Sequence, residues 1–180
     1  MSSSPNDIRP SGKISDRFEY AGTDKLQKLQ IGSLDEPTKG IEAQYNPREL
    51  SVDKSVPWSK HKDSKGDQPH LEFTGADGRS LGLELTFDGF EKKASVQAQV
   101  DALLELAKVR DANASDEDHK RPHKVAVVFG RGSGNLPAFV GVIESVSTKY
   151  TMFLPDGTPV RATCTVKVKE ADKLSFKKGT

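Results

Sequence analysis

The stretch that decides the fold is TKYTMFLPDGTPVRATCTVKVKEA, residues 148–171. It contains two β-prone segments on either side of Pro155-Asp156-Gly157, which are residues typical of a turn. Successive side chains of a strand point to opposite faces, and the second segment alternates accordingly. Its apolar set is Val160, Ala162, Cys164, Val166 and Val168, and its polar set is Arg161, Thr163, Thr165, Lys167 and Lys169. This pattern predicts a hairpin with one face on a core, because a one-residue shift would bury the charged set.

The stretch SLGLELTFDGF, residues 80–90, shows the same alternation. Its apolar positions are Leu81, Leu83, Leu85 and Phe87, and its polar positions are Gly82, Glu84, Thr86 and Asp88. Further short segments of this type are separated by turn residues: KLQKLQIGSL, GIEAQYNP, LSVDKSVPW, HLEFTG, KVAVVFG and FVGVIESVSTKYTMF. Many short strands with turns between them predict a mainly β fold, an antiparallel sandwich or barrel.

One segment has helical periodicity instead. SVQAQVDALLELAKV, at about 95–109, predicts a single amphipathic helix of about four turns with Ser95 as its cap. The predicted apolar stripe is Val96, Val100, Leu103, Leu104 and Ala107. We expect this stripe to lie across the sheet or the rim of a barrel.

Length and composition indicate one domain, since the chain has 180 residues of which 34% are hydrophobic. Residues 1–24 are rich in Ser, Pro, Asp and Gly and are interpreted as a flexible N-terminal arm. Residues 25–171 are the β domain and residues 172–180 a C-terminal tail. The longest apolar runs, such as VAVVF at 125–129, are far shorter than the roughly 20 residues that cross a bilayer. The N-terminus also lacks the apolar segment of a secretory signal.

The charge and cysteine content exclude several classes of partner and cofactor. A net charge of +1 gives no global field for holding nucleic acid or an anionic membrane. With Cys164 as the single cysteine, an intrachain disulfide framework and a multi-cysteine zinc site are both excluded. A single cysteine also fits a reducing compartment. The polar strand with Arg161, Lys167 and Lys169 has no interleaved aromatic residues for stacking bases, and is interpreted as solvated or subunit-facing.

Several motifs contain residue types that occur in catalytic or ligand sites. GRGSGN at 130–135 has the spacing G-x-G-x-G and is followed by a strand, so it is interpreted as a loop and not a dinucleotide site. The His119/His123 and His61/His70 pairs are interpreted as solvated loop histidines and not as metal ligands.

Asp88 and Glu91 could form an acid–base pair, although an aspartate before Gly89 is more typical of a turn. Cys164 is expected to face the core and so to be a packing residue and not a nucleophile. Trp58 and Tyr45 are interpreted as core or interface residues, with a ligand platform as the alternative. The residues therefore predict no catalytic, cofactor or metal site, and they favour a binding or structural role.

Four stretches, in this order and spacing, resemble the contractile injection system tube and baseplate family, whose members build phage-tail-like particles. They are KLQIGSLDEPTKGIEAQYNPREL (28–50), LEFTGADGRSLGLELTFDGFE (71–91), HKRPHKVAVVFG (119–130) and FVGVIESVSTKYTMFLPDGTPVRATCTVKVKEA (139–171). More specifically, the chain resembles the adaptor that joins the inner tube to the baseplate hub. Longer members of that group carry a LysM module, and DKLSFKKGT after Ala171 is too short to form one.

The resemblance implies a tube-type barrel or sandwich with one flanking helix, assembled as a hexameric ring around a channel. It implies as partners other copies of this chain, the inner tube protein, the baseplate hub or spike, and neighbouring baseplate proteins. No nucleic acid, cofactor or membrane insertion is implied. The expected location is the bacterial cytoplasm during assembly, and then a particle that is released or membrane-anchored.

Within such a ring, strands of neighbouring copies can pair edge to edge. The two strictly alternating stretches are therefore candidate subunit-interface or channel strands. Their residues are Leu81, Leu83, Glu84, Leu85, Phe87, Arg161, Thr163, Thr165, Lys167 and Lys169. The alternatives are a repeated inner-tube protein of the same particle, a peptidoglycan-binding module that uses Trp58 and Tyr45, and, least supported, an enzyme.

Overall fold

The computed structural model describes residues 27–60, 71–75, 77–130 and 136–171. Within these ranges it contains nine strands, namely β1 (Gln30–Ser33), β2 (Gly40–Glu42), β3 (Leu50–Lys54), β4 (Trp58–Lys60), β5 (Leu71–Phe73), β6 (Arg79–Asp88), β7 (Lys124–Val128), β8 (Phe139–Phe153) and β9 (Pro159–Glu170). It also contains helix α2 (Gln97–Ala107) and the short 3-10 helix η1 (Glu117–Lys120). The predicted mainly β fold with one α-helix is confirmed. The predicted N-terminal arm and C-terminal tail lie outside the described residues.

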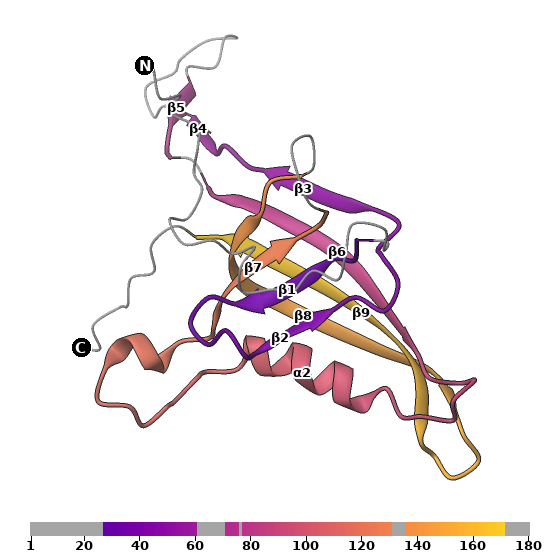
Figure 1. Ribbon diagram of the computed structural model, residues 1–180. Coiled ribbons are helices and arrows are strands. Elements are labelled where there is room, and N and C mark those ends of the chain that lie inside the picture. The colour runs from indigo at the N-terminus through magenta and orange to yellow at the C-terminus, as the bar shows by residue number, and fades with distance from the viewer. Residues whose placement is uncertain (1–26, 61–70, 76, 131–135, 172–180) are drawn as a thin grey trace, which may run out of the picture.

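Seven of these strands form one antiparallel sheet in the order β2-β1-β7-β8-β9-β6-β3 (Figure 1). Strands β8 and β9 form the predicted hairpin, with Thr148 opposite Cys164. In the loop between them, the Leu154 N–H donates to the Thr158 carbonyl oxygen at 2.9 Å. Gly157 has a φ of 87°, a conformation that glycine adopts readily because it has no Cβ. The turn residues therefore fix the register of the long hairpin.

The core lies on the face of the sheet that the alternating pattern predicted. Strand β9 pairs with β6 from Ser80 opposite Lys169 to Asp88 opposite Arg161, without an irregularity. The inward side chains of both strands are at most 4% exposed: Leu81, Leu83, Leu85, Phe87, Val160, Ala162, Cys164, Val166 and Val168. Burying a side chain of this kind stabilises a fold by about 1.5–3 kcal/mol, so this register is favoured strongly over its neighbours.

Helix α2 is shorter than predicted. It has 11 residues, or about three turns at 3.6 residues per turn, and begins at Gln97. Ser95 lies one residue before the N-cap Val96, and its Oγ still accepts the Gln97 N–H at 3.1 Å. Three residues of the predicted apolar stripe, Val96, Val100 and Leu103, are buried as expected. Leu106 is also fully buried, although the predicted stripe did not include it. The predicted Leu104 and Ala107 are only partly buried, because the helix is rotated toward the strands that it covers.

The sheet curls so that helix α2 contacts β8 and β9 as well as β2, which lies at one end of the sheet (Figure 1). The two end strands β2 and β3 are not paired with each other, so the sheet is sandwich-like and not a closed barrel. The side chain of Gln44, just after β2, connects this end of the sheet to the end of β6. The Gln44 amide donates to the Asp88 carbonyl oxygen at 2.6 Å and accepts the Asp88 N–H at 2.8 Å. The Gln44 amide thus makes the same pair of hydrogen bonds to Asp88 that a peptide group of a neighbouring strand would make.

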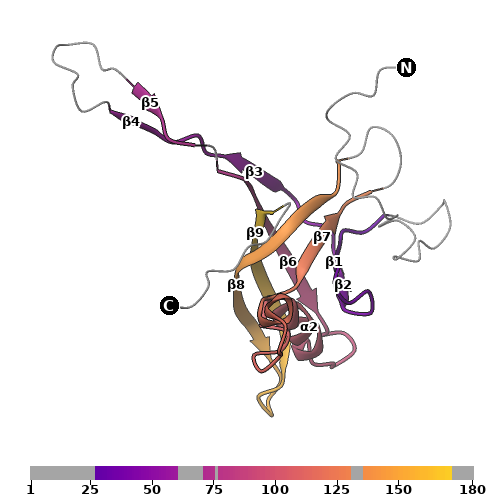
Figure 2. The same ribbon diagram turned by 90° about the vertical axis from the view of Figure 1, so that its left-hand side faces the viewer.

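Strands β4 and β5 form a separate two-stranded ribbon, with Trp58 opposite Phe73 and Lys60 opposite Leu71. Figure 2 shows that this ribbon projects away from the body of the domain. A two-stranded ribbon is marginally stable in water when it packs on nothing else. Its position therefore suggests a role outside the fold of this subunit.

Candidate functional site

The polar residues of the candidate strands share one outward face of the sheet. We call this surface the polar face and define it by outward positions of β6 and β9, and of β8 after its bulge: Gly82, Glu84, Thr86, Arg161, Thr163, Thr165, Lys167, Lys169, Ser145, Ser147 and Lys149. Before the bulge, the apolar Val142 of β8 lies on the same side, opposite Lys169. All of the residues that define the polar face are exposed or partly buried, and none has an apolar side chain. Short hydroxyl groups and a few charges thus cover three adjacent strands. Such a surface is hydrophilic.

The apolar candidate residues lie elsewhere. Leu81, Leu83, Leu85 and Phe87 are buried in the core of the subunit. The backbone of β9 is also paired on both sides, with β8 and with β6. Pairing of β9 with a strand of another copy would require one of these ladders to open. In the isolated subunit, the exposed surface of β9 is therefore the polar face, and its backbone edges are already paired.

Strand β8 contributes to the polar face because its register shifts between Ile143 and Ser145. Such a bulge adds one residue and reverses which positions point inward. Before it, Phe139 and Ile143 are buried, and after it Ser145 and Ser147 are exposed. The Tyr150 hydroxyl then points to the helix side and donates to Gln97 Oε1 at 2.8 Å.

Asp88 is a turn residue whose carboxylate is engaged by its neighbours. Its Oδ1 accepts the Phe90 N–H at 2.9 Å, and its Oδ2 accepts two hydrogen bonds from Arg161, at 2.9 Å from Nε and 2.6 Å from Nη2. The Phe90 hydrogen bond, followed by the Arg161 side chain, holds the pKa of Asp88 below its ordinary value. The carboxylate thus stays ionised and fully engaged. This agrees with the turn interpretation of the sequence.

Cys164 packs in the core, as predicted, and its side chain is fully buried. Burial raises the pKa of its thiol, which keeps the sulfur in the unreactive protonated form. Thr148 Oγ1 lies 3.4 Å from its Sγ, and either atom could be the donor. The residue is therefore a packing group, and it leaves the folded surface free of native thiols among the described residues.

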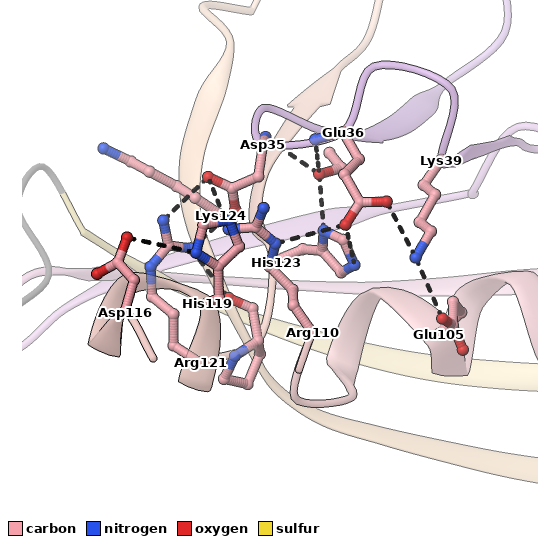
Figure 3. Close-up of polar contacts among 12 residues, drawn as sticks. Asp35, Glu36, Lys39, Glu105, Arg110, Asp116, His119, Arg121, His123 and Lys124 are labelled. Atoms are coloured by element: carbon pink, nitrogen blue, oxygen red, sulfur yellow. Dashed lines mark hydrogen bonds and ion pairs between the residues drawn. The ribbon is translucent and has the colours of Figure 1, made fainter. Parts of the chain in front are cut away.

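A cluster of charged residues joins the loop after β1 to the segment between α2 and β7 (Figure 3). At its centre, Asp35 accepts a bidentate pair of hydrogen bonds from Arg121 at 2.8 and 2.9 Å, and the Lys124 N–H at 2.8 Å. Arg110 Nη1 lies 3.9 Å from Asp35 Oδ1. The side chains of Asp35, Arg121 and Arg110 are only 15, 11 and 10% exposed.

Burial alone would raise the pKa of Asp35. The Arg121 hydrogen bonds, the Lys124 N–H and the charges of Arg121 and Arg110 outweigh burial and hold that pKa below its ordinary value. At the edge of the cluster, Lys39 forms ion pairs with Glu36 at 3.1 Å and with Glu105 of α2 at 3.3 Å. The cluster therefore ties the β1–β2 loop to the helix and to the start of β7.

His123 corrects an expectation from the sequence, because it is a buried residue, 1% exposed, and not a solvated one. Ser33 Oγ accepts the N–H groups of Asp35 and Glu36 at 3.1 and 2.9 Å, so its own hydrogen is left for His123 Nδ1 at 2.9 Å. His123 is then neutral, with its proton on Nε2, which lies 4.0 Å from Glu36 Oε1. Burial lowers its pKa, and the Glu36 carboxylate opposes that effect.

This arrangement makes the fold sensitive to mild acid. Because the pKa of His123 lies below the ordinary value of 6.5, the unfolded chain takes up the proton first as the pH falls. The contribution of neutral His123 to the free energy of unfolding is therefore present above pH 6.5, the pKa of the unfolded chain. It is lost as the pH falls from 6.5 toward the lower pKa of the folded protein. We expect the free energy of unfolding, measured with urea, to fall between about pH 7.5 and 5.5, before carboxylates titrate.

The variant His123→Gln should lose this part of the pH dependence, since glutamine does not titrate. The control His119→Gln changes an exposed histidine whose Nδ1 lies 3.3 Å from Asp116, and it should retain the fall. An unchanged slope in His123→Gln would contradict the assignment.

Sequence reasoning missed this cluster. Asp35 and Arg121 are 86 residues apart, and Ser33 and His123 are 90 apart, so no local pattern joins them. The sequence contained only a weak sign of this cluster. LDEP follows one β-prone segment and RPHK precedes another, and each places charged residues close to a proline. His119 and His123 are not brought together as a pair, since their partners are Asp116 and Ser33.

Aromatic residues predicted to pack in a core or interface are exposed in the isolated subunit. Trp58 and Tyr45 are 57 and 54% exposed, which excludes the core interpretation for both. Trp58 packs edge-to-face on Phe73, which is itself 54% exposed, with ring centroids 5.4 Å apart. Val52, Val56 and Leu71 are exposed near them. The ribbon and its base therefore present an apolar surface.

An apolar cavity of about 190 Å³ lies at the same end of the domain, beside β3 and β7. Its lining includes Leu50, Val52, Leu81, Val127, Phe129, Leu136, Pro137, Ala138 and Phe139, together with Arg79. The Arg79 guanidinium lies 5.7 Å from the centre of the Phe139 ring and is held by Glu170 at 2.6 Å. Leu136, at the rim, is 57% exposed.

Among the described residues, no group of three or more His, Cys, Asp or Glu side chains is arranged to hold a metal ion. In the same part of the chain, no helix is long and apolar enough to cross a membrane. His61, His70 and most of GRGSGN lie outside the described residues.

Comparison with known families gives one match. The family described as contractile injection system tube protein matches residues 25–178, which is most of the chain. A comparison with curated proteins found no match.

Proposed function

Since this chain belongs to the contractile injection system tube protein family, we propose that it forms a hexameric ring that joins or initiates the inner tube at the baseplate. Members of this family assemble with other subunits into a phage-tail-like particle. The proposed partners are further copies of the chain, the inner tube protein, the baseplate hub or spike and neighbouring baseplate proteins. Assembly in the bacterial cytoplasm, before release or anchoring of the particle, belongs to the same proposal.

The observation that carries the proposal is the polar face. Thr163, Thr165 and Lys167 of β9 lie in register with Lys149, Ser147 and Ser145 of β8, so hydrophilic side chains cover adjacent strands continuously. A wall of this kind suits a channel, because it presents hydrophilic side chains to a passing molecule. The opposite face of the same strands is the core, which keeps the wall rigid.

The proposed role is structural and needs no catalysis. Asp88 is held by Arg161, Cys164 is buried, and His123 is bound to Ser33, so the strongest chemical candidates are already engaged in the fold. A net charge of +1 permits close stacking of subunits without strong self-repulsion.

The test is a cryo-EM structure of the assembled particle, combined with the copy number of this chain from quantitative mass spectrometry. We expect one or two hexameric rings at the baseplate end of the tube, with Thr165 and Lys167 facing the channel. Dozens of copies along the shaft would instead identify the chain as the repeated inner-tube protein. A channel lined by other strands would overturn the assignment of the polar face.

A further inference from the structure

Exposed apolar side chains on the projecting ribbon require an explanation. Trp58 of β4 and Phe73 of β5 are more than half exposed, and the two rings already contact each other edge-to-face. Leu71 extends the same ribbon and is 54% exposed. Contiguous apolar surface on a soluble subunit usually marks a site of association. Among the described strands, β4 and β5 pair with each other and with none of the seven-stranded sheet, so a partner would supply the support that the ribbon lacks.

The apolar cavity beside β3 and β7 has the size of one aromatic ring. Its volume is about 190 Å³, and a cavity of about 150 Å³ lined by aliphatic and aromatic residues is large enough to bind benzene. Among the described residues of its lining, the charged one is Arg79, which is already held by Glu170 and whose guanidinium could also face an incoming ring. The cavity is thus suited to an aromatic side chain and not to a polar ligand.

In each subunit, the ribbon of β4 and β5 points away from the body of the domain, as Figure 2 shows. We propose that the ribbon of one copy docks on the next, with Phe73 in the apolar cavity and Trp58 covering its rim at Leu136. The single ring of Phe73 matches the cavity, whereas the indole of Trp58 is larger. This inference rests on the proposed function in one respect, namely that copies of this chain contact each other in a particle.

The contact has a direction, because ribbon and cavity are different surfaces of the subunit. Head-to-tail contacts of this kind close into a ring when the rotation between neighbours allows it, and otherwise they continue as a filament. A symmetric dimer in which two ribbons pair with each other is the alternative arrangement. The two arrangements join different pairs of residues, so cross-linking can distinguish them.

The test uses single-cysteine variants mixed in equal amounts, because the only native cysteine is buried. Leu71→Cys on one copy and Ala138→Cys on another should form a disulfide-linked dimer on mild oxidation, seen on a non-reducing gel. Leu71 lies two residues from Phe73 on the same face of β5, so this variant keeps both aromatic rings. We expect roughly tenfold more dimer than from the control mixture of Asp156→Cys with Ala138→Cys, because docking raises the local thiol concentration. Asp156 is also exposed but lies at the tip of the β8–β9 hairpin.

If Leu71→Cys alone formed as much dimer as the mixture, the ribbons would pair symmetrically, and the proposal would be overturned. Equal yields from the mixture and the control would overturn it as well. In a second measurement, Val52→Trp, added to the copy that carries Ala138→Cys, should fill the cavity and block cross-linking of that copy as acceptor. This test can fail independently of the proposed function. If the particle contains hexameric rings of this chain but the cross-link does not form, only the docking contact is wrong. If the cross-link forms but the copies lie all along the tube shaft, only the adaptor role is wrong.

Discussion

Replacing Asp35 with alanine is expected to lower the free energy of unfolding by roughly 3–5 kcal/mol, the range for removing one partner of a buried ion pair. The variant leaves Arg121 and Arg110 largely buried without the carboxylate that compensates them. It also removes the acceptor of the Lys124 N–H at the start of β7. Urea denaturation at neutral pH measures the effect, and the loss would be a large share of the 5–15 kcal/mol typical of a domain.

A matched control is Asp53→Ala, which removes an exposed carboxylate from strand β3. Exposed substitutions of this kind usually change stability by less than about 0.5 kcal/mol. If Asp35→Ala proves as mild as the control, the cluster is screened by water and does not hold the loops together.

Replacing Phe87 with alanine is expected to destabilise the domain by roughly 3–5 kcal/mol, through lost burial and the cavity that remains. Phe87 is fully buried on β6 and lies opposite Ala162 of β9, whose small side chain cannot fill the space. The effect can be measured in two ways, by urea denaturation and by the rate at which a thiol reagent labels the buried Cys164.

The neighbouring residue supplies the control, because Thr86 lies on the opposite face of the same strand. Thr86→Ala should leave both the denaturation midpoint and the labelling rate nearly unchanged. A large effect at Thr86 with a small effect at Phe87 would mean that β6 has the opposite register.

The strands that alternate strictly were predictable residue by residue. In β6 and β9, each apolar position is buried and each polar position lies on the other face, because period two leaves only one register that keeps charges in water. The helix was harder, since DALLELAKV offers two overlapping apolar stripes. One includes Leu104 and Ala107 and the other Leu106, and the choice depends on where β8, β9 and β2 lie.

The candidate site divides in the same way. The polar face of β9 was visible in the sequence, but its continuation onto β8 depends on the bulge near Glu144, which has no clear signal of its own. The apolar cavity could not be predicted either, because its lining comes from β3, β6, β7 and the segment before β8.

By itself, the sequence determined which strands form, which of their faces meet the core and where the long hairpin turns, because these depend on neighbours along the chain. Only the tertiary structure decided that Asp35 meets Arg121, that His123 is buried against Ser33, and that the ribbon carries Trp58 and Phe73 clear of the body. These features arise where distant segments come together. Their energies depend on burial and on partners far along the chain, which a local pattern does not specify.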